Sequence, residues 1–194
     1  MYFPEHMTFQ YFFFDTYIGY FLQMLPIAVL VGLIYGITKY KTRKGLMLSQ
    51  IIYSSLFVSY ITGLIGLVLL LNLVGDIWYW LLYRGNSFSL NRFFEFSYNL
   101  MPDFWNHING ESVGNLIMFF PFGILYPLAN QKTTFKITIV KGFACVCTIE
   151  LLQPFFGRAF DINDVILNTT GIMISSAIFF AAKYLLSAIK HNRH

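Results

Sequence analysis

The chain has 194 residues, of which 57% are hydrophobic and 11% are charged. Soluble domains carry about 25% charged residues, so this composition argues against a soluble protein and indicates a membrane protein. The formal net charge is +4, but basic patches interleaved with exposed aromatic residues are absent, which disfavours nucleic acid as a partner.

The first part of the chain predicts two membrane-spanning helices. Residues 1–16 are rich in aromatic side chains and are expected to form a lead-in at the membrane surface. Apolar runs follow at 17–38 and 51–74, and each is long enough to cross a bilayer, which takes about 20 helical residues. A basic loop joins them and contains Lys39, Lys41, Arg43 and Lys44.

The longest connection, 75–112, is amphipathic and contains all three tryptophans of the chain. Trp and Tyr are enriched where a membrane meets water. We therefore expect an aromatic interfacial segment at about 76–110, with one or two short helices lying along the membrane surface.

Three more apolar runs follow, at 113–129, 137–156 and 165–186. The sequence thus predicts an all-α membrane protein with five transmembrane helices. Residues 1–194 are expected to form a single domain, because no repeat, low-complexity segment or long polar linker divides the chain.

The basic residues are distributed unevenly between the two ends of the predicted spans. With the loop at 39–44 in the cytoplasm, ten of the thirteen Lys and Arg residues are cytoplasmic, and the other three are Arg84, Arg92 and Arg158. All nine acidic residues fall on the opposite side. Because cytoplasmic loops carry the excess of Lys and Arg, the N-terminus is predicted outside and the C-terminus inside.

Polar side chains from the last three predicted spans meet at the outer end. Glu150 and Gln153 are three residues apart, and Asp164 and Asn168 are four apart, so each pair lies on one helical face. Ionisable groups beside a membrane span are costly and are therefore candidates for function. The full candidate set is Asn115, Glu150, Gln153, Arg158, Asp161, Asp164 and Asn168.

These residue types suit an amphiphile with a polar head. Carboxylates at Glu150, Asp161 and Asp164 are candidate catalytic or cation-binding groups. Candidate ligand-binding side chains are the guanidinium of Arg158, which suits phosphate or carboxylate, and the amides of Asn115, Gln153 and Asn168. No dedicated metal site is predicted, since no histidine joins the cluster and His107 is the only outward one with reach.

Structural roles for the same residues remain open alternatives. Glu150 can pair with Arg158, and Asp164 can be the N-cap of the fifth span. Gln153 and Asn168 can form hydrogen bonds between helices.

The sequence resembles the VanZ-like family of small bacterial membrane proteins over about 91–182. The matching pieces, in order, are Asn115-Leu-Ile-Met-Phe-Phe-Pro121-Phe-Gly123, Glu150-Leu-Leu-Gln153, Arg158, and Asp161-Ile-Asn-Asp164-Val-Ile-Leu-Asn168-Thr-Thr-Gly171. The resemblance implies reduced susceptibility to teicoplanin and related lipoglycopeptides, with little effect on vancomycin. Teicoplanin differs from vancomycin by an acyl chain, which would hold it at the membrane surface.

Two functions from different classes follow. The first is binding of the polar head group of an amphiphile in the outer leaflet. The amphiphile is the antibiotic, lipid II or undecaprenyl phosphate. The alternative is an enzyme that modifies a lipid-linked cell-wall precursor, with Glu150 as general acid or base and Asp161 and Asp164 holding a metal. A transporter is disfavoured, because no acid-lined path reaches the cytoplasmic side. Membrane lipids are the expected partners, and cofactor and oligomeric state are left open.

Overall fold

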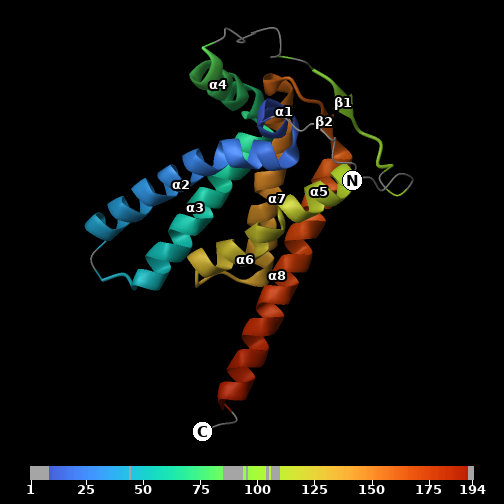
Figure 1. Ribbon diagram of the computed structural model, residues 1–194. Coiled ribbons are helices and arrows are strands. Elements are labelled where there is room, and N and C mark those ends of the chain that lie inside the picture. The colour runs from blue at the N-terminus through green and yellow to red at the C-terminus, as the bar shows by residue number, and fades with distance from the viewer. Residues whose placement is uncertain are drawn as a thin grey trace.

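The computed structural model of the chain describes residues 9–43, 45–84, 94, 96–103, 105 and 110–191. Helices make up most of this structure, and two short strands pair in parallel. In chain order the elements are α1 (Phe9–Asp15), α2 (Tyr17–Thr42), α3 (Leu48–Val68), α4 (Leu71–Tyr83), β1 (Tyr98–Asn99), α5 (Gly110–Met118), α6 (Phe120–Ala129), α7 (Phe135–Leu152), η2 (Gln153–Phe156), β2 (Phe160–Asp161) and α8 (Ile162–His191) (Figure 1).

Among the described residues, three helices are long and apolar enough to cross a membrane: Ile18–Thr42 in α2, Leu48–Val68 in α3 and Ile162–Lys190 in α8. The predicted helical class is therefore confirmed, and these three helices fit membrane spans by their length and composition. Helix α7 has 18 residues but contains three charged side chains, Lys136, Lys141 and Glu150. The count of five spans and the orientation of the termini stay predictions.

The second predicted span, 51–74, is divided in the structure. Helix α3 ends at Val68, and α4 begins at Leu71. The guanidinium of Arg158 donates a hydrogen bond to the carbonyl of Val68 at 3.3 Å, which satisfies an acceptor that a continuing helix would use itself. The end of α3 thus coincides with a hydrogen bond from a residue 90 positions later in the chain. The residues that join α3 to α4 include no proline or glycine.

Helix α4 lies across the upper end of α2 and α3 (Figure 1). Its 13 residues make a helix of about 20 Å, which is too short to cross a bilayer. The indole of Trp78 donates to the carbonyl of Gln23 in α2 at 3.0 Å, and its ring contacts Phe13 of α1 edge-on at 5.7 Å. These contacts tie α1, α2 and α4 together. The rest of the predicted interfacial segment falls largely outside the described residues, as do residues 1–8.

The third predicted span, 113–129, is broken into α5 and α6. Pro121 lies in the first turn of α6 and lacks the N–H that a continuous helix would need. The next amide, that of Phe122, donates to the carbonyl of Phe119 at 3.1 Å. The carbonyl of Met118 is thereby released from the helical pattern, and the hydroxyl of Tyr60 in α3 donates to it at 3.0 Å.

Removing the Tyr60 hydroxyl should destabilise the fold. A Tyr60→Phe variant leaves the Met118 carbonyl without its donor in a half-buried position, which costs about 1–3 kcal/mol of unfolding free energy. The measurement is thermal unfolding of the protein purified in detergent. The control is Tyr126→Phe, because Tyr126 contacts its neighbours through its ring, stacked on Phe122 at 5.4 Å. An equal loss in both variants would contradict the role given to the hydroxyl.

Helix α8 is the helix against which α5, α6 and α7 all pack. Its side chain Ile172 is fully buried, as is Phe119 between α5 and α6. Close approach depends on glycine at two places. A Cβ atom at Gly123 would lie 2.1 Å from the Ser175 hydroxyl, and a Cβ atom at Gly171 would lie 2.2 Å from the backbone oxygen of Leu116. Helix α8 also begins and ends outside its predicted range of 165–186, at Ile162 and His191.

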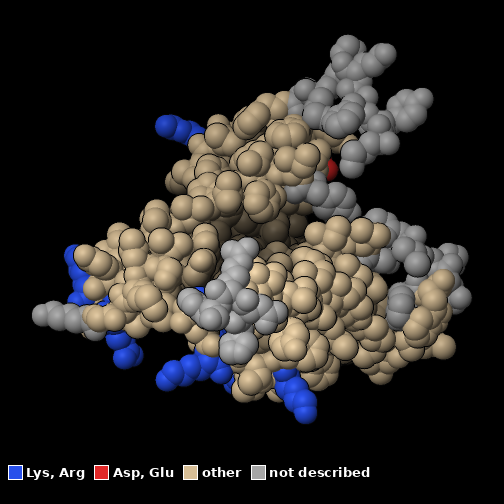
Figure 2. Space-filling view, turned by 90° about the horizontal axis from the view of Figure 1, so that it is seen from below, with Lys and Arg blue, Asp and Glu red and all other residues tan. Residues whose placement is uncertain are grey.

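The two ends of the bundle differ in charge. Figure 2 views the end that holds the last turn of α2, the first turn of α3 and the α6–α7 turn, and Lys and Arg side chains gather around it. Asp161 and Asp164 lie at the other end, where α8 begins. The charge separation expected from the sequence is therefore present in space for the described residues.

Candidate functional site

The connection between α7 and α8 is short and tightly shaped. The 3-10 helix η2 continues directly from α7 and ends at Gly157, whose φ of +75° is in the left-handed region that glycine adopts without strain. The amide of Arg158 then donates to the Gln153 carbonyl at 3.1 Å. This turn reverses the chain, so that the end of α7 faces the beginning of α8.

Three polar side chains form a buried centre between α7, η2 and α8. Glu150 is 1% exposed, and Gln153 and Asn168 are each 2% exposed. The amide of Gln153 donates to Oε1 of Glu150 at 3.1 Å, and the amide of Asn168 donates to the same oxygen at 3.5 Å. Asn168 therefore forms the hydrogen bond between helices that the structural alternative supposed, whereas Gln153 binds Glu150 within the continuous α7–η2 segment.

The buried centre contains two oxygen atoms for which the described residues provide no hydrogen-bond donor. Oε2 of Glu150 and Oδ1 of Asn168 are buried and have no hydrogen-bond partner in the described part of the chain. Glu150 also lies within electrostatic reach of Asp164 and Arg158. Buried oxygens of this kind require a donor, and a cation, a water molecule or the proton of the carboxyl group itself can supply it.

Asp164 connects α8 to α5. The amide of Asn115 donates a short hydrogen bond to Oδ1 of Asp164, and the contact of Gly171 with Leu116 lies on the same pair of helices. Asp164 is half-buried and occurs in the first turn of α8, where a negative charge is favoured by the partial positive charge of the helix N-terminus.

The N-cap of α8 is Asp161 rather than Asp164, which corrects the alternative drawn from the sequence. Oδ1 of Asp161 accepts hydrogen bonds from the backbone and side-chain amides of Asn163, at 2.8 and 2.9 Å. The side chain of Asn99 in β1 donates to both carboxylate oxygens at 3.2 Å. The helix begins three residues earlier than the apolar pattern predicts, so the capping role moves to the earlier aspartate.

An Asp161→Ala variant should lose about 2 kcal/mol of stability, because it removes the cap together with the acceptor for Asn99. Asp161→Asn keeps a side-chain oxygen and should lose less than half as much. Thermal unfolding of the purified variants measures both effects. Equal stability of the Ala and Asn variants would show that capping is not what this carboxylate contributes.

Arg158 differs from the buried centre in being exposed. Its guanidinium uses one N–H for the Val68 carbonyl, and an arginine carries five such donors. The side chains that donate to Glu150 are Gln153 and Asn168, rather than Arg158 as the pairing alternative supposed. Arg158 is therefore anchored at one N–H and has donors to offer to a ligand.

Two residues of this end were missed by the sequence reading. Asn163 is 8% exposed, accepts from the backbone amide of Asp103 at 2.9 Å, and donates to the Asp103 carboxylate at 2.9 Å. Asn99 holds Asp161 from β1. The signal for Asn163 was its place between two aspartates, but Asn99 and Asp103 lie in the segment read only as aromatic and interfacial.

No group of three or more His, Cys, Asp or Glu side chains in the described ranges is arranged to hold a metal ion. The histidine considered from the sequence, His107, falls outside those ranges. The candidate carboxylates instead have amide partners: Gln153 and Asn168 for Glu150, Asn99 for Asp161, and Asn115 for Asp164.

The fold and the site together define a helical membrane protein with a network of carboxylates and amides at one end of its bundle. The model of the VanZ/LLP1 family matches residues 57–184, and the chain belongs to this family. No curated protein and no solved structure matches the chain.

Proposed function

We propose that the chain crosses the membrane five times, with its N-terminus outside, and that the carboxylate and amide network faces outward. There it binds the head group of an outer-leaflet amphiphile and so lowers susceptibility to teicoplanin and related lipoglycopeptides. The antibiotic itself, lipid II and undecaprenyl phosphate all fit this description.

The proposed orientation is supported by the difference in charge between the two bundle ends, of which Figure 2 shows the one with Lys and Arg side chains around it. Lys39, Arg43 and Lys132 line one cavity between the α2–α3 hairpin and the α6–α7 turn, whereas Asp161 and Asp164 lie at the other end, where α8 begins. Cytoplasmic ends of membrane proteins collect Lys and Arg, so the carboxylate end is the outer one.

The observation that carries the proposal is the convergence of side chains from α5, α7, η2 and α8 on one place. The buried centre is closed to a ligand at 1–2% exposure, so its part is to hold the start of α8 in position. Arg158 is exposed, and Asp161 and Asp164 are half-buried. In this proposal Arg158 contacts the phosphate or carboxylate of the head group, and the two aspartates accept its hydroxyl or amine protons.

The test is antibiotic susceptibility of a sensitive Gram-positive host that expresses the wild type, Glu150→Gln or Arg158→Gln. The wild type should raise the inhibitory concentration of teicoplanin and leave that of vancomycin unchanged, and both variants should lose this effect while still accumulating in the membrane. The matched control is Asp15→Asn, which neutralises an exposed acid in α1. Retained protection in both variants would contradict the role of this network in protection. A well-expressed wild type that gives no protection would refute the teicoplanin role.

A further inference from the structure

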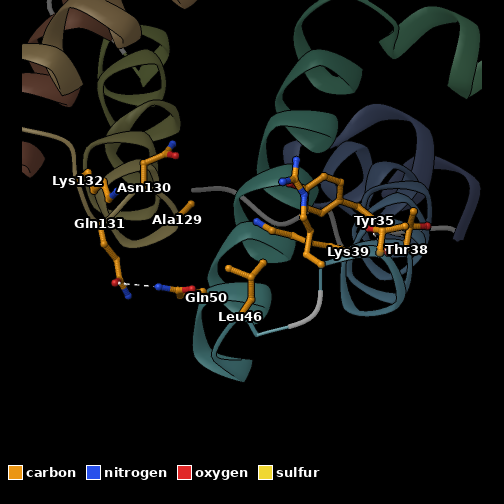
Figure 3. A pocket seen from close by; sticks show the side chains of 11 residues that line it. Tyr35, Thr38, Lys39, Leu46, Gln50, Ala129, Asn130, Gln131 and Lys132 are labelled. Atoms are coloured by element: carbon orange, nitrogen blue, oxygen red, sulfur yellow. Dashed lines mark hydrogen bonds between the residues drawn. The ribbon is translucent and has the colours of Figure 1, made fainter.

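A second polar site lies at the end of the bundle opposite to the carboxylate network. A cavity of about 620 Å³ opens between the α2–α3 hairpin and the turn from α6 to α7. Figure 3 shows its two walls, with Tyr35, Thr38 and Lys39 on the α2 side and Asn130 and Lys132 on the other. The side chains of Gln50 and Gln131 join the walls by a hydrogen bond of 3.1 Å.

The charge of this cavity has one sign. Among the described residues that line it, Lys39, Arg43 and Lys132 are cationic and none is acidic. The cations come from both walls, two from the end of α2 and one from the α6–α7 turn. Cations that serve only to orient a protein in the membrane need not converge, whereas here they surround a single cavity.

Lys39 is held in position before any ligand binds. Its ammonium group donates to the Ser54 hydroxyl at 2.7 Å and lies 5.5 Å from the centre of the Tyr35 ring. One of the three N–H donors of the ammonium group is used in this way, and two are left for a ligand. A positioned cation loses less conformational entropy on binding than a mobile one, which favours a specific contact.

The surroundings of the cavity indicate an amphiphile rather than a free ion. Leu46 lines the cavity and is 37% exposed, and the next two residues, Met47 and Leu48, are 62% and 65% exposed. Apolar side chains beside a cationic rim offer a surface for acyl chains next to the phosphate position.

We infer that this cavity binds the phosphate of an anionic membrane lipid, with Lys39 and Lys132 as its principal contacts. The inference does not depend on the function proposed for the carboxylate end, because the two sites share no residue. In the proposed orientation the lipid belongs to the cytoplasmic leaflet.

Native mass spectrometry of the full chain in detergent micelles tests this inference. Phosphatidylglycerol and phosphatidylcholine with identical acyl chains are the two probes. The wild type should bind its first phosphatidylglycerol molecule with higher affinity than its first phosphatidylcholine molecule. Lys39→Gln and Lys132→Gln should each weaken that binding about fivefold, the effect typical of one cation near an anionic head group.

Lys136→Gln is the matched control, since Lys136 is exposed in the first turn of α7 but does not line the cavity. It should leave the binding unchanged, and Lys39→Arg should restore most of what Lys39→Gln loses. Equal affinity for the two lipids, or an equal loss in Lys136→Gln, would overturn the inference. Displacement of the lipid by millimolar inorganic phosphate would show that the site takes a soluble anion and would overturn the lipid assignment. Lys132→Gln, in an exposed turn, keeps the test valid if Lys39→Gln fails to fold.

Discussion

A Gly171→Ala variant is expected to lose about 3 kcal/mol of unfolding free energy. Its new Cβ atom would lie 2.2 Å from the backbone oxygen of Leu116, far inside van der Waals contact. Because that oxygen belongs to α5 and not to a flexible side chain, relief requires α5 and α8 to separate. Overpacking in a well-filled interior costs about 1–3 kcal/mol, and the separation also strains the neighbouring hydrogen bond from Asn115 to Asp164.

The measurement is thermal unfolding of the purified protein, with Gly114→Ala as the matched control. Gly114 lies in α5, and apart from the backbone of its own helix no described atom lies within 4 Å of its added Cβ, so alanine there should be neutral or stabilising by up to about 1 kcal/mol through helix propensity. The two identical substitutions should therefore act in opposite directions. If Gly171→Ala proved as stable as Gly114→Ala, the close packing of α5 on α8 would be wrong.

The helical class and the approximate positions of the membrane helices follow from apolar runs, but the interruptions do not. The end of α3 at Val68 coincides with a hydrogen bond from Arg158 to the Val68 carbonyl. An apolar run in the sequence does not show a hydrogen bond from such a distant residue. Pro121 was visible in the third run, yet proline is tolerated in membrane helices when a neighbour satisfies the freed carbonyl. Here Tyr60 donates to the carbonyl of Met118, which the amide of Phe122 leaves free, but the helix is broken all the same.

More of the candidate site than of the helix boundaries could be predicted from the sequence. Residues three or four apart lie on one face of a helix, and this spacing can be read directly from the sequence. Glu150 and Gln153 are hydrogen-bonded neighbours as their three-residue spacing indicates. The meeting of Glu150 with Asn168 followed from placing both at the same membrane end. The capping residue could not be derived, since the apolar pattern does not show that α8 starts at Ile162. The burial of individual side chains could not be derived from the sequence either. In the structure Glu150, Gln153 and Asn168 are buried, whereas Arg158 is exposed.

Truncating Glu150 is expected to have the largest effect on stability of any change at the site. Glu150→Ala removes the acceptor for the amides of Gln153 and Asn168, which are 2% exposed. Leaving each of these buried amides without its acceptor costs about 1–3 kcal/mol, and the lost side-chain volume adds a cavity. Glu150→Gln keeps the size and one acceptor oxygen, so its loss should be about 1 kcal/mol.

The comparison of the two variants separates support of the fold from function. Glu150→Ala should fail to accumulate or should unfold at a much lower temperature, whereas Glu150→Gln should fold and yet lose protection against teicoplanin. Leu151→Ala is the control for truncation, because the adjacent Leu151 side chain is 60% exposed and its loss should be small. Equal stability of Glu150→Ala and Glu150→Gln would mean that the carboxylate does not hold α7 to α8. A stable Glu150→Gln with full protection would mean that the Glu150 carboxylate is not needed to position Asp161 and Asp164 for the head group.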